Sequence, residues 1–540
     1  MFVTSKAQDL LTYSRSTTGT YIGSDGLLKT AAVDEARIEY DGSGNLQGLL
    51  LEPISSNKID YSEDFSQWQS TGTFTLTAGQ KDPRGGNAAY LFVDQDGTNA
   101  RPYIQNVFNI SADADNRWTV SLYVKKPATN GVSRVEIHTS FSGVDLNSEF
   151  LQVNFDSNGS ISSISSGVPI GSEAGGVVLS HGYEELPNGW YRIHFIIRDP
   201  ELNTTLTMRI FPNGRADASN TGGLLIFGAQ VEQNHMLTSY IPTSGTEVTR
   251  QPDIAYIDID QFGVKQDRGT FVAEINNLKW FTAQPSADFP RVIEFGNTTN
   301  ATDRLIPMLV RTDGNLVYNA IRTEDVFQAS FTYEDYADSA DVGPFSGKVA
   351  LRYDETSARA AENGVLIGNE DAIDDIVGQP PFRTRLALKD EANLVATGNG
   401  DGVAFHIKTL QYYPRKLADH EISLETYYGT INTTYYVTNS GSAAYAFTGG
   451  ATGNNPTLDV VRGNTYAFSV NASGHPFYLT TDDGTNYSAG NYVSEYTTGV
   501  TNSRSQDNTL FWTVDASAPN TLYYQCGNHA AMKGTINITG

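Results

Sequence analysis

Cysteine is almost absent from this chain of 540 residues, since Cys526 is the single one. One thiol cannot form a disulfide within the chain, so cysteine usage says nothing about the redox state of the compartment. Basic residues are also scarce, with 36 Lys and Arg against 61 Asp and Glu and a formal net charge of −25. Nucleic-acid-binding proteins obtain most of their affinity from clustered cations, so this balance argues against a nucleic-acid partner.

Long hydrophobic runs are missing as well. No stretch approaches the roughly 20 apolar residues that cross a bilayer. The opening MFVTSKAQDLLTYSRSTTG lacks the basic start and the continuous apolar stretch of a secretory signal. We therefore expect a soluble chain that does not insert into a membrane and is not exported by that route.

Glycine and aromatic residues, in contrast, are abundant, with 50 Gly, 29 Tyr and 25 Phe. This composition is typical of many short strands joined by tight turns, and it predicts an all-β fold class. At roughly 150 residues per domain, the length predicts three or four domains.

Alternating hydrophobicity supports the strand prediction in two segments. In WTVSLYVKK, every second residue from Trp118 to Val124 is apolar, and YRIHFIIRD repeats the pattern from Tyr191 to Ile197. The opposite faces, with Ser121 in the first segment and Arg192 and His194 in the second, are predicted to face outward. His194 is accordingly expected to be a solvent-facing strand histidine and not a metal ligand.

Two further segments have recognisable local signals. ENGVLIG places Asn363 and Gly364 between apolar stretches, which predicts a two-residue hairpin turn. RKLADHEISLETYYG has Leu417 and Leu424 near a helical repeat and Gly429 as a stop, which predicts a helix over 417–428.

Changes in composition divide the chain into four parts. The first part is polar and rich in turns, and the next two have the size of two-sheet sandwiches. No repeat of fixed short period is present, which disfavours a solenoid or propeller. The predicted division is 1–57, an attachment or packing segment; 58–255, a carbohydrate-binding-like jelly roll; 256–430, a second jelly roll; and 431–540, a third sandwich.

The first two β units resemble known families. NKIDYSEDFSQW and the later FGAQVEQNHMLTSYIPTSGTEVTR resemble a module of tailed-bacteriophage structural proteins, a carbohydrate-binding or concanavalin-like jelly roll, and the segment upstream is similar to the one that precedes it there. YYPRKLADHEISLE is similar to the end of a laminin-G-type jelly roll, where Arg415, Leu417, Glu421 and Ile422 would belong to a short closing helix. The resemblance implies a virion protein, whereas the fold alone identifies no ligand.

Two acidic motifs are candidate sites within these units. GNEDAIDD, at 368–375, concentrates oxygen donors that suit calcium, although it lacks EF-hand spacing and acidic loops are usually just solvated. IDID, at 257–260, puts Asp258 and Asp260 on one strand face, whereas glycosidases need two carboxyls at a defined separation. No further acid follows at a hydrolase-like spacing, and Ser/His/Asp and phosphate-loop signatures are missing, so the chain is predicted not to be an enzyme.

The strongest candidate site surrounds the single cysteine, in LYYQCGNHAAMKG. Leu522, Tyr524 and Cys526 share a strand parity, so the thiol is predicted to face the core. Upstream, His475 falls on the same side as Phe477, which puts an imidazole on an apolar face with no acidic neighbour. Such a buried group needs a partner, because leaving it unsatisfied costs roughly 1–3 kcal/mol.

We predict that His475, Cys526 and His529 surround copper in a type 1 site, with Met532 as a weak axial ligand. A soft thiolate, two imidazoles and a thioether suit copper, whereas zinc rarely uses methionine. The arrangement resembles the cupredoxins of the plastocyanin and amicyanin type. The fold implied for the whole chain is two jelly-roll sandwiches followed by a cupredoxin-like Greek-key β-sandwich. The alternative is a packing role for Cys526 and Met532 in a domain that has lost its metal.

These features together predict a bacteriophage virion structural protein, a tail fibre or similar appendage, for host-surface or glycan recognition. The alternatives are a capsid or tail decoration or adaptor protein without a glycan ligand, and a glycan-degrading tail enzyme. Expected partners are other virion proteins, a host cell-surface glycan and further copies of the chain, for example in a trimer. The expected location is the virion, assembled in the host cytoplasm and exposed on the extracellular particle.

Overall fold

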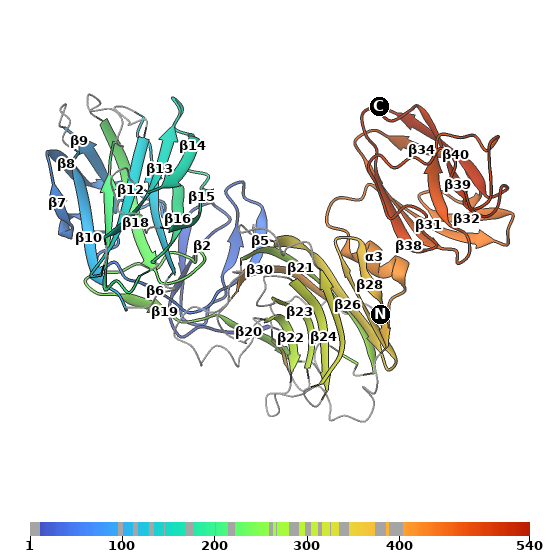
Figure 1. Ribbon diagram of the computed structural model, residues 1–540, viewed down its shortest axis with the longest axis horizontal. Helices are drawn as coiled ribbons and strands as arrows, with labels where there is room; N and C mark the ends of the chain where they lie inside the picture. Colours follow the sequence, from blue (N-terminus) through green and yellow to red (C-terminus); the bar gives the residue numbers. More distant parts are fainter. Residues whose placement is uncertain are drawn as a thin grey trace.

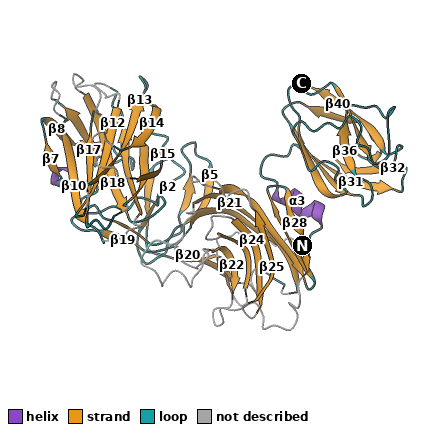
Figure 2. Cartoon of the chain, viewed as in Figure 1, coloured by secondary structure: helices purple, strands orange, loops and turns teal. Residues whose placement is uncertain are grey.

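The computed structural model confirms the all-β fold class. It describes residues 11–95, 101–111, 117–128, 134–144, 146–168, 177–199, 201–213, 222–258, 263–265, 267–279, 291–296, 304–310, 316–323, 326–333, 345–372, 385–387 and 403–540. Within these ranges the regular structure is almost entirely strand, in three sandwiches, with one α-helix (Figure 2). No helix in these ranges is long and apolar enough to cross a membrane.

The first sandwich consists of two six-stranded antiparallel sheets. After a 3₁₀ turn, η1 (Phe65–Gln67), its strands are β7 (Gln69–Thr71), β8 (Phe74–Gln80), β9 (Ala89–Asp94), β10 (Tyr103–Asn109), β11 (Arg117–Lys125), β12 (Arg134–Ser142), β13 (Asn147–Phe155), β14 (Ile161–Gly167), β15 (Val177–Glu185), β16 (Tyr191–Arg198), β17 (Thr205–Phe211) and β18 (Gly222–Glu232). The strand orders are β14-β13-β12-β17-β10-β7 and β15-β16-β11-β18-β9-β8.

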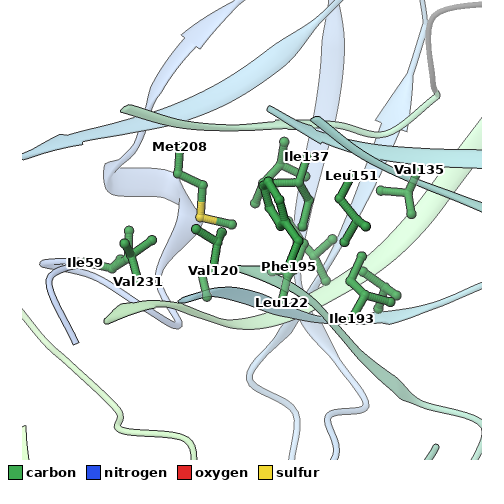
Figure 3. Packing of buried hydrophobic residues seen from close by; sticks show 14 of the residues in the cluster. Ile59, Val120, Leu122, Val135, Ile137, Leu151, Ile193, Phe195, Met208 and Val231 are labelled. Atoms are coloured by element: carbon green, nitrogen blue, oxygen red, sulfur yellow. The ribbon is translucent and has the colours of Figure 1, made fainter. Parts of the chain in front are cut away.

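The core of this sandwich forms where the alternating apolar residues of the two sheets meet. Figure 3 shows Val120 and Phe195, from β11 and β16, close to Ile137 and Met208, from β12 and β17. All four side chains are completely buried. The period of two in the sequence therefore identified the inward faces of β11 and β16 correctly.

The predicted outward faces of β11 and β16 are also covered, so that part of the prediction is wrong. Arg192 is buried, and its guanidinium donates to the carbonyl oxygen of Thr238 at 2.7 Å and to the Ser121 hydroxyl at 3.1 Å. His194 is half-buried opposite Gly182 of β15, and burial lowers the pKa of His194 to about 4. A second layer of chain, 234–243, lies over this face and supplies the polar partners.

The second sandwich also receives strands from the N-terminal segment. Its strands are β1 (Leu11–Ser14), β4 (Ile38–Tyr40), β5 (Leu46–Leu51), β20 (Ile254–Asp258), β21 (Arg268–Lys279), β22 (Arg291–Gly296), β23 (Arg304–Val310), β24 (Leu316–Thr323), β25 (Val326–Tyr333), β26 (Phe345–Asp354), β27 (Ser357–Glu362), β28 (Val365–Ala372), β29 (Arg385–Ala387) and β30 (Ala404–Tyr413). The strand orders are β1-β20-β29-β22-β23-β24-β25 and β28-β27-β26-β21-β30-β5-β4.

Residues 11–57 thus connect the first two sandwiches. Leu49 and Leu51 of β5 lie in the core of the second sandwich. Two small two-stranded sheets lie nearer the first sandwich, and Figure 1 shows β2, β6 and β19 beneath it. These are β2 (Gly19–Ile22) with β3 (Leu28–Ala31), and β6 (Ser55–Asn57) with β19 (Val248–Arg250).

Five charged side chains are buried together in this connecting region. Arg37 is 2.7 Å from Glu52 and also pairs with Asp253, which lies 3.0 Å from Arg15. Arg250 completes the group at 3.5 Å from Glu52. Burial alone would raise the pKa of both carboxyls, but the Arg37 and Arg250 guanidiniums outweigh it and hold both pKa values below the usual range. This group is called the arginine–carboxylate cluster below.

The predicted hairpin and helix are both present. Asn363 and Gly364 have φ values of 48° and 87° in the two-residue turn between β27 and β28, as the sequence predicted. The helix, α3 (Asp419–Thr426), is shorter than predicted, and it buries Ile422 and Thr426 while Leu424 is only half-buried. It lies beside β28 and next to the C-terminal sandwich (Figure 1).

The C-terminal sandwich packs a six-stranded sheet against a four-stranded one. Its strands are β31 (Thr433–Ser440), β32 (Ala444–Gly449), β33 (Gly453–Asn454), β34 (Leu458–Val461), β35 (Thr465–Asn471), β36 (Phe477–Thr480), β37 (Val500–Thr501), β38 (Asp507–Thr513), β39 (Thr521–Cys526) and β40 (Lys533–Thr539). The orders are β33-β32-β31-β35-β38-β37 and β34-β40-β39-β36, with β31–β35 and β34–β40 parallel.

Candidate metal centre

Two neighbouring strands of the four-stranded sheet bring the predicted ligands together. β36 pairs antiparallel with β39, so Phe477 lies opposite Cys526. His475 comes just before β36, and the loop that carries His529 follows directly after β39. The pairing continues one step further, because the Gly527 amide donates to the carbonyl oxygen of Pro476 at 2.8 Å. This bond holds the loop after Cys526 beside His475.

The cysteine points into the core, as its strand parity predicted. Leu522, Tyr524 and Cys526 are all completely buried, whereas Tyr523 between them is only half-buried. His475 exposes 9 % of its surface. A thiol and an imidazole from distant parts of the sequence therefore meet at the edge of the apolar core.

The donor atoms of His475, Cys526 and His529 form a compact triangle. The two Nδ1 atoms are 3.0 Å apart. The Cys526 sulfur lies 3.9 Å from Nδ1 of His475 and 3.7 Å from Nδ1 of His529. Across the described ranges, this is the one group of three His, Cys, Asp or Glu side chains whose donor atoms are close enough to share a metal ion. The structure thus brings together three of the four ligands predicted from the sequence.

The size of the triangle fits one metal ion. A triangle with these three sides has a circumscribed circle of radius about 2.1 Å, so a single point lies at that distance from all three donor atoms. Bonds from a zinc ion are ~2.0–2.1 Å to imidazole nitrogen and ~2.3 Å to thiolate sulfur. An ion of this size therefore fits without a change in the backbone. One cysteine with two histidines is the trigonal donor set of blue-copper sites.

Met532, the fourth predicted ligand, closes the loop over the cysteine. Its side chain is completely buried in the same apolar cluster as Cys526. The Cys526 amide donates to the Met532 carbonyl oxygen at 2.9 Å, and the Met532 amide donates to the His529 carbonyl oxygen at 3.3 Å. These bonds place Met532 next to the three donors, and its role as an axial ligand stays a prediction.

Neighbouring polar groups orient the three donors. The Asn528 amide donates to the Cys526 sulfur at 3.3 Å, and the Tyr445 hydroxyl donates to the His475 carbonyl oxygen at 2.7 Å. The side-chain amide of Asn439 lies 3.4 Å from Nε2 of His475. Partners of this kind fix ring orientation and tautomer in metal sites. Sequence reasoning missed Asn439 and Tyr445, because they lie on β31 and β32 in the opposite sheet of the sandwich and reach the site across it.

The centre carries no carboxylate. His138 and His406 elsewhere in the chain each pair with a carboxylate, whereas no carboxylate of the described residues is close enough to join the three donors here. Burial, followed by the nearby His529 ring, lowers the pKa of His475. The neutral imidazole, which is the form that binds metal, is therefore favoured at His475.

The remaining sequence candidates are not brought to this centre. The side chains of the acidic segment 368–375 and of the Asp258–Asp260 pair lie outside the described ones. Calcium binding by the former and an acidic pair in the latter therefore stay predictions. His194 belongs to the first sandwich and to no group of three converging His, Cys, Asp or Glu donors in the described ranges.

The fold and the site define the class of the protein: it is an all-β protein with three sandwiches and a His–Cys–His centre. No protein-family model matches the chain, and no curated protein matches it. Solved structures do match, at low similarity. One is the enzymatically active domain of tailspike protein 4 of bacteriophage CBA120, with 13 % identity over 32 % of this chain and 21 % of that chain, at a TM-score of 0.19. The chain thus spans about a fifth of that structure.

Two other matches cover more of both chains. Domains LG4–5 of the mouse laminin α1 chain share 10 % identity over 65 % of this chain and 93 % of theirs, at a TM-score of 0.18. A mutant of Trypanosoma rangeli sialidase displaying trans-sialidase activity shares 11 % identity over 74 % and 64 %, at a TM-score of 0.22. The titles of the tailspike domain and the sialidase name an enzymatic activity. They contradict the prediction that the chain is not an enzyme, and that prediction is withdrawn.

Proposed function

We propose that the C-terminal sandwich is a cupredoxin-like domain that binds one copper ion through His475, Cys526 and His529, with Met532 as the axial ligand. The observation that carries this proposal is the convergence of two Nδ1 atoms and one sulfur on a single point about 2.1 Å from each. Bound there, copper supplies a cation that stabilises the thiolate and gives the thiolate–copper pair a blue colour. The donor set favours copper over zinc because a thioether is a soft ligand.

The copper ion has a structural role in this proposal. It joins the start of β36 to the loop between β39 and β40, which no disulfide can do in a chain with one cysteine. A ligand that binds the native state and not the unfolded chain adds to stability.

Titration of the full-length protein with Cu²⁺ tests the site. We expect one equivalent to bind with an intense blue absorption band, and Cys526→Ser to abolish the band. Met532→Leu, which conserves volume, should keep the band and shift the reduction potential. His181→Ala is the matched control, because His181 is an exposed histidine on β15. A wild type that binds no copper, or an unchanged band in Cys526→Ser, would refute the proposal.

We further propose that the whole chain is a bacteriophage virion protein, a tail fibre or similar appendage, that recognises a glycan on the host surface. The sequence segments around 57–68 and 227–250 support it through their resemblance to phage structural modules. The all-β architecture of three sandwiches is consistent with this proposal. Assembly with other virion proteins and with further copies of the chain belongs to the same proposal.

Three measurements separate this function from its alternatives. Electron microscopy of intact particles shows whether the chain occupies an appendage or a decorating position. A glycan array with the full-length protein gives specific binding if the host-recognition proposal holds, and none if the protein is an adaptor without a glycan ligand. Incubation with host polysaccharide, followed by a search for new reducing ends, tests the glycan-degrading alternative. A chain absent from purified particles would overturn the virion assignment.

A further inference from the structure

A cleft of about 280 Å³ lies where the N-terminal segment and the first two sandwiches meet. The end of β15 supplies Glu184, and the adjacent β16 supplies the buried Arg192. The second sandwich contributes Lys279 from β21 and His406 from β30, and the N-terminal segment contributes Glu39 from β4. The cleft therefore exists only when all three parts are packed together. Ligand sites occur preferentially at such junctions between domains. The volume of this cleft is close to the lower limit of typical ligand pockets, about 300 Å³.

The walls of the cleft are acidic. Burial alone would raise the pKa of Glu184, but Lys279 and Arg192 outweigh it and lower the pKa to about 2, so Glu184 is ionised at neutral pH. Glu184 nevertheless exposes 45 % of its side chain, so its oxygens are accessible from solvent. The lining contains the carboxyls of Glu39, Asp41, Glu52, Glu184 and Glu185 and the permanent cations of Arg192 and Lys279.

Each of these carboxyls already has a donor within the protein. Glu39 accepts from Nε2 of His406 at 2.6 Å and from the Ile22 amide at 3.0 Å. Glu184 pairs with Lys279 at 3.3 Å. Glu52 belongs to the arginine–carboxylate cluster, the Asp41 side chain accepts amides of its own turn, and Glu185 accepts from the Tyr191 hydroxyl at 3.2 Å. Each carboxylate is thus hydrogen-bonded within the protein, while it keeps lone pairs free for further donors.

One buried nitrogen of the lining lacks a hydrogen-bond partner. His406 exposes 3 % of its surface, its Nε2 is occupied by Glu39, and its Nδ1 has no partner among the described atoms. Leaving such an atom unsatisfied costs roughly 1–3 kcal/mol. A ligand that brings a hydroxyl group to this wall would satisfy it. The unpartnered Nδ1 atom is a second observation, besides the carboxyls, that indicates a polar ligand in the cleft.

We infer that this cleft binds one ring of a neutral saccharide. A sugar offers many hydroxyl groups that donate to carboxylates and to Nδ1 of His406 and accept from Lys279, without adding charge. Tyr21, Tyr40 and Tyr123 also line the cleft and give apolar surface to a ring. A cation is less suited, because the carboxyls already face internal donors. An acidic sugar is disfavoured, because its carboxylate would enter a wall in which five carboxyls outnumber two permanent cations.

Saturation-transfer NMR with the full-length protein tests this inference. The probes are D-glucose, D-galactose and N-acetyl-D-glucosamine, with N-acetylneuraminic acid as the acidic counterpart. We expect saturation of at least one neutral probe, at least tenfold weaker binding of the acidic one, and at least a tenfold rise in Kd for Glu184→Ala. Glu247→Ala is the matched control, because Glu247 is an exposed glutamate paired with Lys58 at 2.6 Å outside the cleft. Its Kd should equal that of the wild type.

Several results would overturn the inference. These are no saturation of any neutral probe, equal or tighter binding of N-acetylneuraminic acid, or an unchanged Kd in Glu184→Ala. If Glu184→Ala lowers the yield of folded protein, Glu39→Gln gives the same test from another wall. The inference rests on the proposed glycan recognition and gives it a location. Array binding that survives in both variants would keep the proposed function and reject this cleft.

Discussion

Two clusters of polar side chains differ in how their charge is balanced. One lies in the region that connects the first two sandwiches, and the other lies in the C-terminal sandwich. The arginine–carboxylate cluster contains its own counter-ions, since Glu52 and Asp253 face the guanidiniums of Arg15, Arg37 and Arg250. The His–Cys–His centre contains three donors and no cation. In the arginine–carboxylate cluster the charges are paired within the chain. The donors of the His–Cys–His centre instead have the arrangement of a metal-binding site.

Burial alone therefore does not identify a binding site. The side chains of the first cluster are buried, and in the second Cys526 is completely buried while His529 is half-buried. Both clusters draw on segments far apart in the sequence. In the first, every charged group has an opposite charge within 4 Å, so nothing further is needed. In the second, the thiolate form of Cys526 would be a buried charge with an amide donor from Asn528 but no opposite charge among the three donors, which is costly unless a metal ion supplies one.

The largest effect is expected from removing one charge of the complete cluster. Arg37→Met leaves Glu52 and Asp253 with fewer cations in a buried site, and breaking a buried pair in this way typically costs about 3–5 kcal/mol. Urea unfolding of the full-length protein, followed by tryptophan fluorescence, measures the loss. An unchanged free energy of unfolding would show that the remaining arginines satisfy both carboxylates, and that Arg37 is dispensable.

The sequence predicted much of the C-terminal centre, because its ligands lie within strand-periodic segments. The parity of Leu522, Tyr524 and Cys526 sufficed to point the thiol inward, and the same rule placed His475 with Phe477. The structure agrees on all of these positions. Asn439 and Tyr445 could not be found in this way, because they contact the site from the opposite sheet, and packing between sheets leaves no local pattern in the sequence.

The same rule failed for the outer face of the first sandwich. Arg192 occupies the position of a solvent-facing residue in an alternating strand, but chain from 234–243 covers it. Alternation reports polarity, and a polar residue can face either water or a second polar layer. The pairings of β1 with β20 and of β5 with β30 join residues more than 200 positions apart, and the sequence of β1 or β5 contains no signal for such a distant partner.

A third kind of buried polar group sharpens the comparison, because it has neither counter-ion nor metal. Glu149 is completely buried, accepts one bond from Thr139 at 2.9 Å, and has a second oxygen without a partner in the described ranges. Burial raises the pKa of Glu149 from 4.5 to about 8. The folded state therefore holds a proton that the unfolded chain loses, and this contribution to stability declines as pH rises from about 4.5 to 8.

Glu149→Gln should remove that decline. Between pH 5 and pH 7, the free energy of unfolding of the wild type should fall by roughly 2–3 kcal/mol relative to the variant, at 1.36 kcal/mol per pKa unit. Urea unfolding at a series of pH values measures the difference between the two proteins. A difference that stays constant with pH would mean that Glu149 is ionised in the folded protein.

Metal binding gives a smaller effect that is specific to the incomplete cluster. With free Cu²⁺ at ten times Kd, binding to the native state alone should add about 1.4 kcal/mol to the free energy of unfolding. Cys526→Ser should lose this gain while keeping most of its metal-free stability, because serine is close in size to cysteine. Equal stabilisation of both proteins would indicate copper binding elsewhere, and the comparison between the clusters would then fail.

The smallest effect on the free energy of unfolding is expected for an ion pair on the surface. Lys29 and Asp25 form an ion pair at 2.5 Å, but their side chains are 40 % and 48 % exposed. Water and salt screen such a pair, so Lys29→Ala should leave the unfolding transition unchanged within error. If this variant instead matched the loss in Arg37→Met, the opposite charges themselves would determine stability in both places. We expect burial to make the difference. An exposed carboxylate that loses its partner is hydrated by water, whereas a buried carboxylate is not.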